Sequence, residues 1–540
     1  MHNLKRRPGL ILLLVAAALF SLSLYLVLRL SMFMVSSHGI FDKFTAFLLL
    51  MAELFLLIHG AGYLTEIFIV MRHKSLTKDE VDYPKPASFP PVAVVVASYH
   101  EPLEILENTL TCFYNLSYPN KYLFLLDDTR YDLSGNVKSE REAYRKAVDE
   151  LCWRKKIDLF RRNWRGAKAG IVNDFVRFLG GILSDGFQYT RFSDRKPDSS
   201  IGLLAVFDAD QNPFPDFLEP LVAILDQNPS SAFVQTPQYY TNTDKNRIAR
   251  AAGMQQQVFY EFICEGKALK NAIFCCGTNV LFRIEALKNV GGFDESSVTE
   301  DFATSIRFHT KGWSSDYCNR PSAFGMGPED LGAYFKQQHR WALGTLGLLP
   351  KIIWLFLKNP FLLSPARWWE YFLSGSYYGI GLVFLTLAVT PLAWIFFSIP
   401  TFFGDPDIYF LLFLPYLLLT LGIFFWTLKE RNYRPWEIFS GQLLAMLCFP
   451  VHIRAMLSAF TGARGRFVIT PKGQSNTIPW LSLWPQLLLW SFCFAGIVWG
   501  FNRMIYDDVS PAAMGINMFW CLYHFGLLST VFYYNTPGKE

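Results

Sequence analysis

The sequence predicts an α/β domain inserted in a polytopic membrane domain of α-helices. Six apolar segments are each long enough to cross a bilayer, which needs about 20 consecutive apolar residues. Between the second and the third segment, short β-rich hydrophobic runs alternate with stretches of helical spacing. These boundaries divide the 540 residues into an N-terminal membrane part at 1–90, an α/β domain at 91–345 and a second membrane part at 346–540.

The composition agrees with a membrane protein and argues against a nucleic-acid-binding one. The chain has 50 Phe, 25 Tyr and 15 Trp with only 18% charged residues, more aromatic surface than one globular core needs. Its formal charge of +5 is small and no dense basic block occurs, so nucleic acid is not an expected partner. The nine Cys include no CxxC pair, so we expect reduced thiols and no cysteine metal site.

The six apolar segments are expected to be transmembrane helices. The first follows Lys5, Arg6 and Arg7 and lacks a small-residue cleavage site, so we interpret it as a signal anchor. Lys and Arg cluster at alternate ends of the segments, which places the N-terminus and residues 72–367 in the cytoplasm. The expected spans are residues 9–28, 44–71, 371–399, 408–428, 480–501 and 512–533.

Two further apolar stretches, 341–357 and 436–460, are interrupted by Pro and charged residues. Both are predicted to lie in the membrane interface with one wet face. Polar groups also occur inside the predicted spans, namely Glu53, His59 and Glu66. They are compatible with a water-filled conduit and equally with a satisfied packing role.

The α/β domain begins at Pro91. Its predicted strands are hydrophobic throughout, as strands covered on both faces should be. Alternation with helices predicts a largely parallel sheet, with the ligand site at the carboxyl ends of its strands. Residues 184–200 are polar and are expected to form a loop insertion. The predicted strands are 92–97, 122–126, 203–207 and 232–235, and the predicted helices are 104–116, 139–151 and 167–179.

Acidic and polar residues follow three of these strands. They are Ser98-Tyr99-His100-Glu101-Pro102, Asp127-Asp128 and Asp208-Ala209-Asp210. Two carboxylates with one residue between them, leaving a buried strand, suit Mg²⁺, which keeps coordination positions for phosphate and water. Asp is also favoured where a strand ends in a turn, so each pair taken alone has a structural interpretation as well.

Two later motifs carry further candidate groups. Thr299-Glu300-Asp301 precedes a helical stretch, either as a helix N-cap with acids on the helix dipole or as the site of a general base. In Gln337-Gln338-His339-Arg340-Trp341, the first, fourth and fifth side chains lie on one side of a helical turn. Arg suits phosphate and an indole suits a sugar ring, whereas Trp and Arg also favour the membrane boundary as anchors.

These motifs, in this order, resemble the processive family 2 glycosyltransferases, above all cellulose synthase catalytic subunits. Three positions depart from cellulose synthases: Gln338 replaces the usual Arg, as in hyaluronan synthases; Gln211 replaces a frequent His; and Ile469 replaces the usual Val. Few residues follow the last span, so we expect no PilZ domain. Further similar stretches are AKAG at 167–170, VQTP at 234–237, FCCGT at 274–278 and FVITPKG at 467–473, which is similar to the gating-loop motif FxVTxK.

The resemblance implies a GT-A fold, a UDP-sugar donor and Mg²⁺ (or Mn²⁺) held by Asp208 and Asp210. It implies catalysis by Asp301 as the base, with Glu300 and Thr299 beside it. The implied donor-binding residues are Tyr99, Glu101, Asp128, Lys168, Asp208, Gln337, Arg340, Thr470 and Lys472, the last two in a gating loop at 464–475. The implied acceptor-binding residues are Trp341, Cys276 and Thr278.

The implied function is a processive inverting hexosyltransferase that polymerises a β-linked polysaccharide, foremost a β-glucan from UDP-glucose, and translocates it across the plasma (inner) membrane. The implied partners are the UDP-sugar, the growing polysaccharide, the lipid bilayer and a periplasmic or cell-envelope accessory subunit. Alternatives are a synthase of hyaluronan, chitin or mixed-linkage or β-1,3-glucan, and a non-processive transferase to a lipid carrier. A channel with a regulatory cytoplasmic domain is a third.

Overall fold

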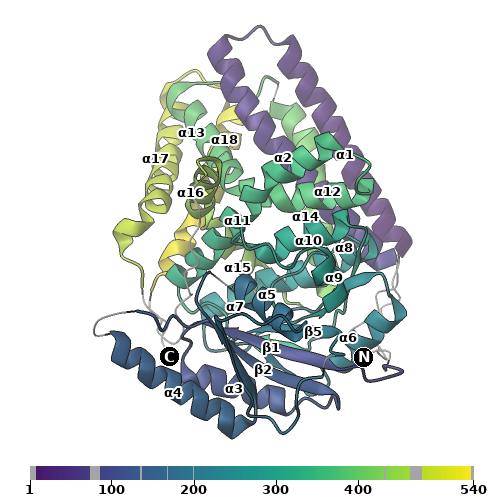
Figure 1. The fold of residues 1–540 in the computed structure, drawn as a ribbon. Coiled ribbons are helices and arrows are strands. Elements are labelled where there is room, and N and C mark those ends of the chain that lie inside the picture. The colour runs from purple at the N-terminus through teal and green to yellow at the C-terminus, as the bar shows by residue number, and fades with distance from the viewer. Residues whose placement is uncertain are drawn as a thin grey trace.

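The computed structural model describes residues 8–72, 85–133, 137–166, 168–198, 200–404, 406–430, 433–462 and 477–536. An α/β domain lies at one end of the molecule and long helices rise from it (Figure 1). The first two helices, α1 (Pro8–Val35) and α2 (Ile40–Arg72), form a hairpin before the chain enters the α/β domain. The other helices long and apolar enough to cross a membrane begin at α11 (Leu331–Lys358), near the end of that domain.

The central sheet has eight strands in the order β10-β7-β9-β5-β1-β2-β3-β4. Its centre is parallel, because β1 (Val92–Ser98) lies between β2 (Lys121–Asp127) and β5 (Leu203–Asp208) with both in the same direction. Strand β9 is antiparallel to both neighbours, and β4 is antiparallel to β3, so the sheet is mixed. The other bounds are β3 (Asp158–Arg162), β4 (Phe187–Thr190), β7 (Ser231–Gln235), β9 (Val280–Arg283) and β10 (Ser314–Tyr317).

Each face of the sheet carries its own core. Along β1, Val94 belongs to a cluster with α3 (Leu103–Tyr114), whereas Val95 belongs to a cluster with α5 (Lys168–Leu179) on the other face. This alternation is why β1 is apolar at every position from Val92 to Ala97. The other helices of this domain include α4 (Val137–Lys155), α6 (Leu218–Gln227), α9 (Ile284–Asn289) and α10 (Glu300–Thr310).

The structure confirms the four predicted strands and three predicted helices of this domain. The loop prediction for residues 184–200 is wrong in part, because β4 lies within it and pairs with β3. The pairing is held by side chains too: the Phe160 and Phe187 rings lie 5.4 Å apart, and the Tyr189 hydroxyl donates to Asp158 at 2.6 Å. A second sheet, β6 (Asn212–Pro213), β11 (Ala323–Gly325) and β8 (Tyr239–Tyr240), was not predicted.

Seven helical segments of the described chain are long and apolar enough to cross a membrane. Six agree with the predicted spans, and the seventh is α11 (Leu331–Lys358), which contains the stretch predicted to be interfacial. Two shorter helices, α15 (Pro435–Met446) and α16 (Phe449–Phe460), are bent by 46° at their junction. The other bounds are α12 (Pro365–Ser376), η2 (Tyr377–Gly379), α13 (Ile380–Phe397), α14 (Pro406–Glu430), α17 (Trp484–Tyr506) and α18 (Pro511–Tyr534).

The polar residues of the first two helices have partners. Glu53 accepts hydrogen bonds from Tyr25 at 2.7 Å and from Arg29 at 3.2 Å. The His59 ring nitrogens lie 2.9 Å from the Phe55 carbonyl oxygen and 3.3 Å from that of Leu373. For Glu53 and His59 these contacts favour the packing role over the conduit.

Glu66 joins the membrane helices to the α/β domain instead. Lys270, just after α8 (Glu265–Leu269), contacts Glu66 of α2 at 2.6 Å and Glu370 of α12 at 2.7 Å. Lys267 of α8 contacts the other oxygen of Glu370 at 2.6 Å. All four side chains are nearly or fully inaccessible to solvent, so this buried charge cluster fixes the two parts of the molecule together.

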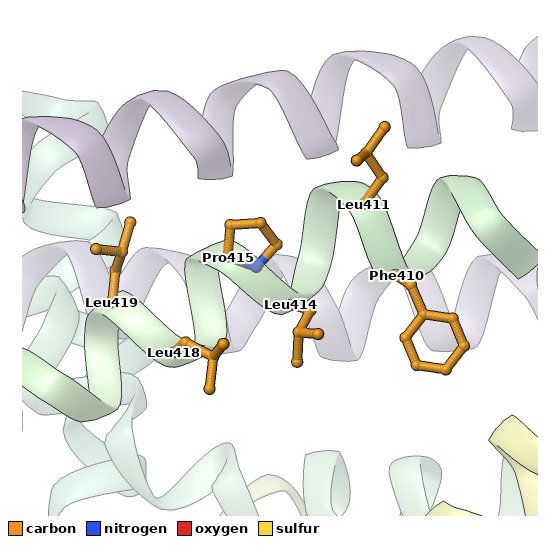
Figure 2. Close-up of a pocket in the computed structure, with 6 residues that line it drawn as sticks. All are labelled: Phe410, Leu411, Leu414, Pro415, Leu418 and Leu419. Carbon is orange, nitrogen blue, oxygen red and sulfur yellow. The ribbon is translucent and has the colours of Figure 1, made fainter.

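A pocket of about 540 Å³ lies on α14, and no acidic residue lines it. Its lining is entirely apolar, and Figure 2 shows side chains projecting on two sides of the helix. The charged sugar nucleotide that the resemblance implies would need polar groups to bind it, and this pocket offers none. The lining residues are Phe410, Leu411, Leu414, Pro415, Leu418 and Leu419.

Candidate active site

Three parallel strands end at one edge of the sheet, as the sequence predicts. Ser98 at the end of β1 lies opposite Asp127 of β2, and Ala97 lies opposite Asp208 of β5. The residues that follow these strands are therefore neighbours in space although they are far apart in the sequence.

The pair Asp127 and Asp128 is held by two arginines of β3. Asp127 accepts hydrogen bonds from Arg161 and from the Tyr131 hydroxyl, both at 2.7 Å. The two oxygens of Asp128 accept from Arg162 at 3.0 and 3.2 Å. Burial raises the pKa of Asp128 to about 6 although Arg162 lowers it. Each of the two carboxylates therefore has its own buried arginine partner at this strand end.

The segment after β1 is fixed by side chains of α4 and of the β2 end. His100 adopts φ 55° and donates its backbone N–H to Thr129 Oγ1 at 2.9 Å. Its ring lies 4.4 Å from the ring of Tyr144, whose hydroxyl donates to the Glu101 carbonyl at 2.7 Å. Tyr99 and Glu101 are therefore placed at the same sheet edge as Asp128.

Lys168, the first residue of α5, connects the third strand end to a loop. Its ammonium contacts Asp208 and donates to the Gly277 carbonyl at 2.7 Å. Burial lowers the pKa of Lys168, but the carboxylates of Asp208 and Glu300 outweigh this effect and the pKa is raised. Asp208 is 48% exposed at its side chain, so Lys168 leaves it accessible to a ligand.

The loop 275–278 separates Lys168 from the predicted base. Gly277 has φ 85°, and a Cβ atom there would lie 2.9 Å from Asp301 Oδ2. Thr278 Oγ1 accepts a hydrogen bond from the backbone N–H of Asp208 at 2.9 Å. Cys276, Thr278 and Asp301 are thus brought to the place at which Asp208 leaves its strand.

Glu300 and Asp301 lie in the first turn of α10. Thr299 occupies the N-cap position of α10, as one of the two interpretations predicts. Its side chain, however, makes no capping hydrogen bond. Burial first, and then the charge of Glu300, raise the pKa of Asp301 to about 7, against the lowering effect of Lys168 and Arg340. A carboxyl group with a pKa near neutrality is suited to act as a general base.

Helix α11 delivers the polar pentad to these carboxylates. It packs closely on the start of α10, since a Cβ atom on Gly344 would lie 2.5 Å from the Thr299 side chain. Arg340 is near enough to lower the pKa of Asp301 and of Glu300. Trp341 follows in the same turn and is half-buried.

Gln337 and Asp210 approach each other at Tyr240 of β8. Burial raises the pKa of the Tyr240 phenol; a hydrogen bond from Gln337 lowers it and the charge of Asp210 raises it. Asp210, Gln337 and Arg340 therefore converge from a strand end and from α11. Tyr240 was not among the predicted site residues, and its position three residues beyond the VQTP stretch gave no signal of its own.

Two parts of the site prediction, the gating loop and the metal site, are not tested by the structure. Thr470 and Lys472, with the rest of the 464–475 loop, lie outside the described residues. No group of three or more His, Cys, Asp or Glu side chains able to hold a metal occurs in the described part of the chain. A cation at Asp208 and Asp210 would thus need oxygens from a ligand.

Sequence comparisons identify the chain with known glycosyltransferases. Residues 93–291 match the family model "Glycosyl transferase family 2", and residues 203–427 match "Glycosyl transferase family group 2". A cellulose synthase catalytic subunit (UDP-forming) of Pseudomonas fluorescens (strain SBW25) is 27% identical over 89% of this chain. The cellulose synthase 1 catalytic subunit (UDP-forming) of Komagataeibacter xylinus is 24% identical over 84% of it.

The matched regions cover 61% and 57% of the length of those two relatives. Among solved structures, the mannosyltransferase PcManGT from Pyrobaculum calidifontis in complex with GDP-Man and Mn²⁺ aligns with 76% of this chain and 99% of its own. Its TM-score is 0.46 and its sequence identity is 16%. The family match and the mixed sheet together confirm a GT-A domain joined to a domain of membrane helices. Residues 93–291 therefore match glycosyltransferase family 2, and over most of its length the chain is similar to the catalytic subunits of cellulose synthases.

Proposed function

We propose that this protein is a processive inverting glycosyltransferase that polymerises a β-glucan from UDP-glucose and translocates it across the membrane. The observation that carries the proposal is the arrangement around Gly277. On one side of this residue lies the half-buried carboxyl of Asp301, and on the other lies Lys168 with Asp208. A single displacement at a sugar carbon requires a base on one face of that carbon and a leaving-group site on the opposite face, and these groups lie on the two sides of Gly277.

Asp301 acts as the base in this proposal. With a pKa of about 7, caused first by burial, it can accept the proton of the attacking acceptor hydroxyl near neutral pH. The hydroxyl attacks the anomeric carbon from the face opposite the diphosphate. An α-linked donor therefore gives a β-linked product.

The donor lies on the other side of Gly277. Lys168, Gln337 and Arg340 would bind the diphosphate, since all three approach the Asp208 to Asp210 segment. Tyr99, Glu101 and Asp128 would bind the uridine at the neighbouring strand ends. The half-exposed carboxylate of Asp208, with Asp210, is a hard oxygen set that fits Mg²⁺ or Mn²⁺. When bound, such an ion would neutralise the charge that develops on the leaving diphosphate.

The acceptor would leave along the membrane helices. Trp341 would stack on the terminal sugar, with Cys276 and Thr278 beside it, because α11 runs from the catalytic carboxylates into the apolar part of the molecule. Thr470 and Lys472 would close a gating loop over bound nucleotide. In this proposal the catalytic domain and the N-terminus face the cytoplasm, the chain lies in the plasma (inner) membrane, and an accessory subunit receives the polymer outside.

The test is a panel of labelled UDP-sugars offered to membranes that contain the protein, followed by linkage analysis of any polymer. We expect incorporation from UDP-glucose into a β-linked product of many residues. Failure to incorporate glucose would overturn the glucan assignment, and label found only in a lipid-linked monosaccharide would overturn processivity.

Gln338 favours a second candidate, a hyaluronan-type synthase, because that family carries Gln at this position. Gln338 is 3% exposed on α11 and so is part of the packing beneath the pentad. The same donor panel separates the two, since a hyaluronan-type enzyme requires UDP-glucuronate together with a UDP-N-acetylhexosamine.

A further inference from the structure

The 275–278 loop is hydrogen-bonded to four different elements, three of which contribute side chains to its backbone. The Cys275 N–H donates to Ser305 of α10 at 2.8 Å, and the Gly277 carbonyl accepts from Lys168 of α5. The backbone N–H of Asp208 in β5 donates to Thr278. The fourth element is β7, which contributes its last residue, Gln235.

Gln235 contacts the loop on both flanks of Gly277. Its side-chain oxygen accepts from the Cys276 N–H at 2.8 Å, and its amide nitrogen donates to the Thr278 carbonyl at 2.9 Å. The same nitrogen donates to the Thr236 carbonyl at 2.8 Å. Gln235 is fully buried, so water cannot replace these bonds if the side chain is shortened or made apolar.

The two hydrogen bonds from Gln235 to Cys276 and Thr278 fix the position of Gly277 between them. Gly277 contacts Asp301 through its α-carbon side and Lys168 through its carbonyl. If the loop shifts, the space between the proposed base and the proposed leaving-group site changes. Gln235 itself is not adjacent to either reacting partner in the proposed mechanism.

We propose that Gln235 is a positioning residue for sugar transfer, which keeps the 275–278 loop against Asp301 and thereby keeps that carboxyl aimed and free of water. The inference rests on the proposed function. Because Gln235 bonds Cys276 and Thr278, the proposed acceptor-binding residues, its loss should reduce kcat and product length and leave donor binding intact.

Two variants test this role. Gln235→Met is of similar size and removes both loop contacts. Gln235→Glu keeps an acceptor for the Cys276 N–H but sets a carboxylate oxygen against the Thr278 carbonyl. Ser231→Ala is the matched control, because Ser231 is fully buried on the same strand and bonds the Phe233 carbonyl.

For both Gln235 variants we expect an unchanged Kd for UDP in calorimetry and an unchanged KM for UDP-glucose. We expect kcat to fall about 10-fold or more, the scale of a buried hydrogen-bond pair left unsatisfied, and the polymer to shorten. The acid limb of the kcat–pH profile should move to lower pH, because water admitted to Asp301 removes the burial that raises its pKa. Ser231→Ala should retain the wild-type values.

Three outcomes would overturn the role of Gln235. They are wild-type kcat in both variants, a joint loss of UDP binding and kcat, and a lowered kcat with an unmoved pH profile. The last two would indicate a purely structural residue. A wild-type protein that incorporates sugar from no donor refutes the proposed function instead, so the two failures are distinguishable.

Discussion

Replacing Gly277 by Ala should impair catalysis more than folding. The new Cβ atom would lie 2.9 Å from Asp301 Oδ2, about 0.5 Å closer than the 3.4 Å at which ordinary contact begins. The φ of 85° adds a backbone penalty of about 1–2 kcal/mol for any residue with a side chain. Since a displacement of 1 Å can reduce a rate about 100-fold, we expect kcat to fall at least about 10-fold.

Gly291→Ala separates the two effects. Gly291 has a similar φ of 81° but an added Cβ atom would meet nothing within 4 Å. Both variants should therefore lose a similar amount of thermal stability in detergent, while only Gly277→Ala loses polymer synthesis from labelled UDP-glucose. Equal kcat values in the two variants, or a Gly277→Ala enzyme as active as the wild type, would refute the placement of Asp301 against this loop.

Three further predictions concern the base, the acceptor and the charge network. Because burial raises the pKa of Asp301 to about 7 and the base acts when deprotonated, kcat should fall about 10-fold per pH unit below neutrality. A flat kcat–pH profile down to pH 5, or an active Asp301→Asn enzyme, would exclude this role. Trp341→Ala should bind UDP normally in calorimetry yet make no long polymer, and long product from it would argue for a membrane anchor. Arg162→Gln should lower the free energy of unfolding by about 3 kcal/mol, because the buried Asp128 loses its partner. Thermal unfolding measures this loss, and the control variant Arg154→Gln, at an exposed arginine, should not show it.

The fold was predictable where hydrophobic pattern and length act locally. The strands at 92–97 and 203–207 are apolar at every position because both faces of the sheet are covered, and the membrane helices are long apolar runs. Strand β4 was missed because its burial alternates on an exposed edge and its pairing with β3 depends on residues about 30 positions away. Because this pairing is non-local, the polar sequence of β4 carries little signal of a strand.

The residues of the candidate site also fall into a predictable group and an unpredictable group. Asp208, Asp301 and Arg340 stand in motifs whose spacing could be read from the sequence, whereas the roles of Gln235 and Ser305 depend on where a loop from another part of the chain arrives. Asp127 and Asp128, at the end of β2, show that a motif does not by itself predict the partners of its residues. Adjacent in sequence and alike in chemistry, they have separate arginine partners.

The buried charge cluster of Glu66, Lys267, Lys270 and Glu370 bears on how the enzyme can be produced. A fragment cut to residues 91–345 would keep both lysines and lose both carboxylates, which come from α2 and α12. Each buried ammonium left without its counter-charge is destabilising by about 3–5 kcal/mol, a large part of the stability of most domains. A catalytic fragment without α2 and α12 should therefore aggregate on expression unless Lys267 and Lys270 are replaced by apolar residues. Any shortened form of the protein should keep both helices, because they carry Glu66 and Glu370.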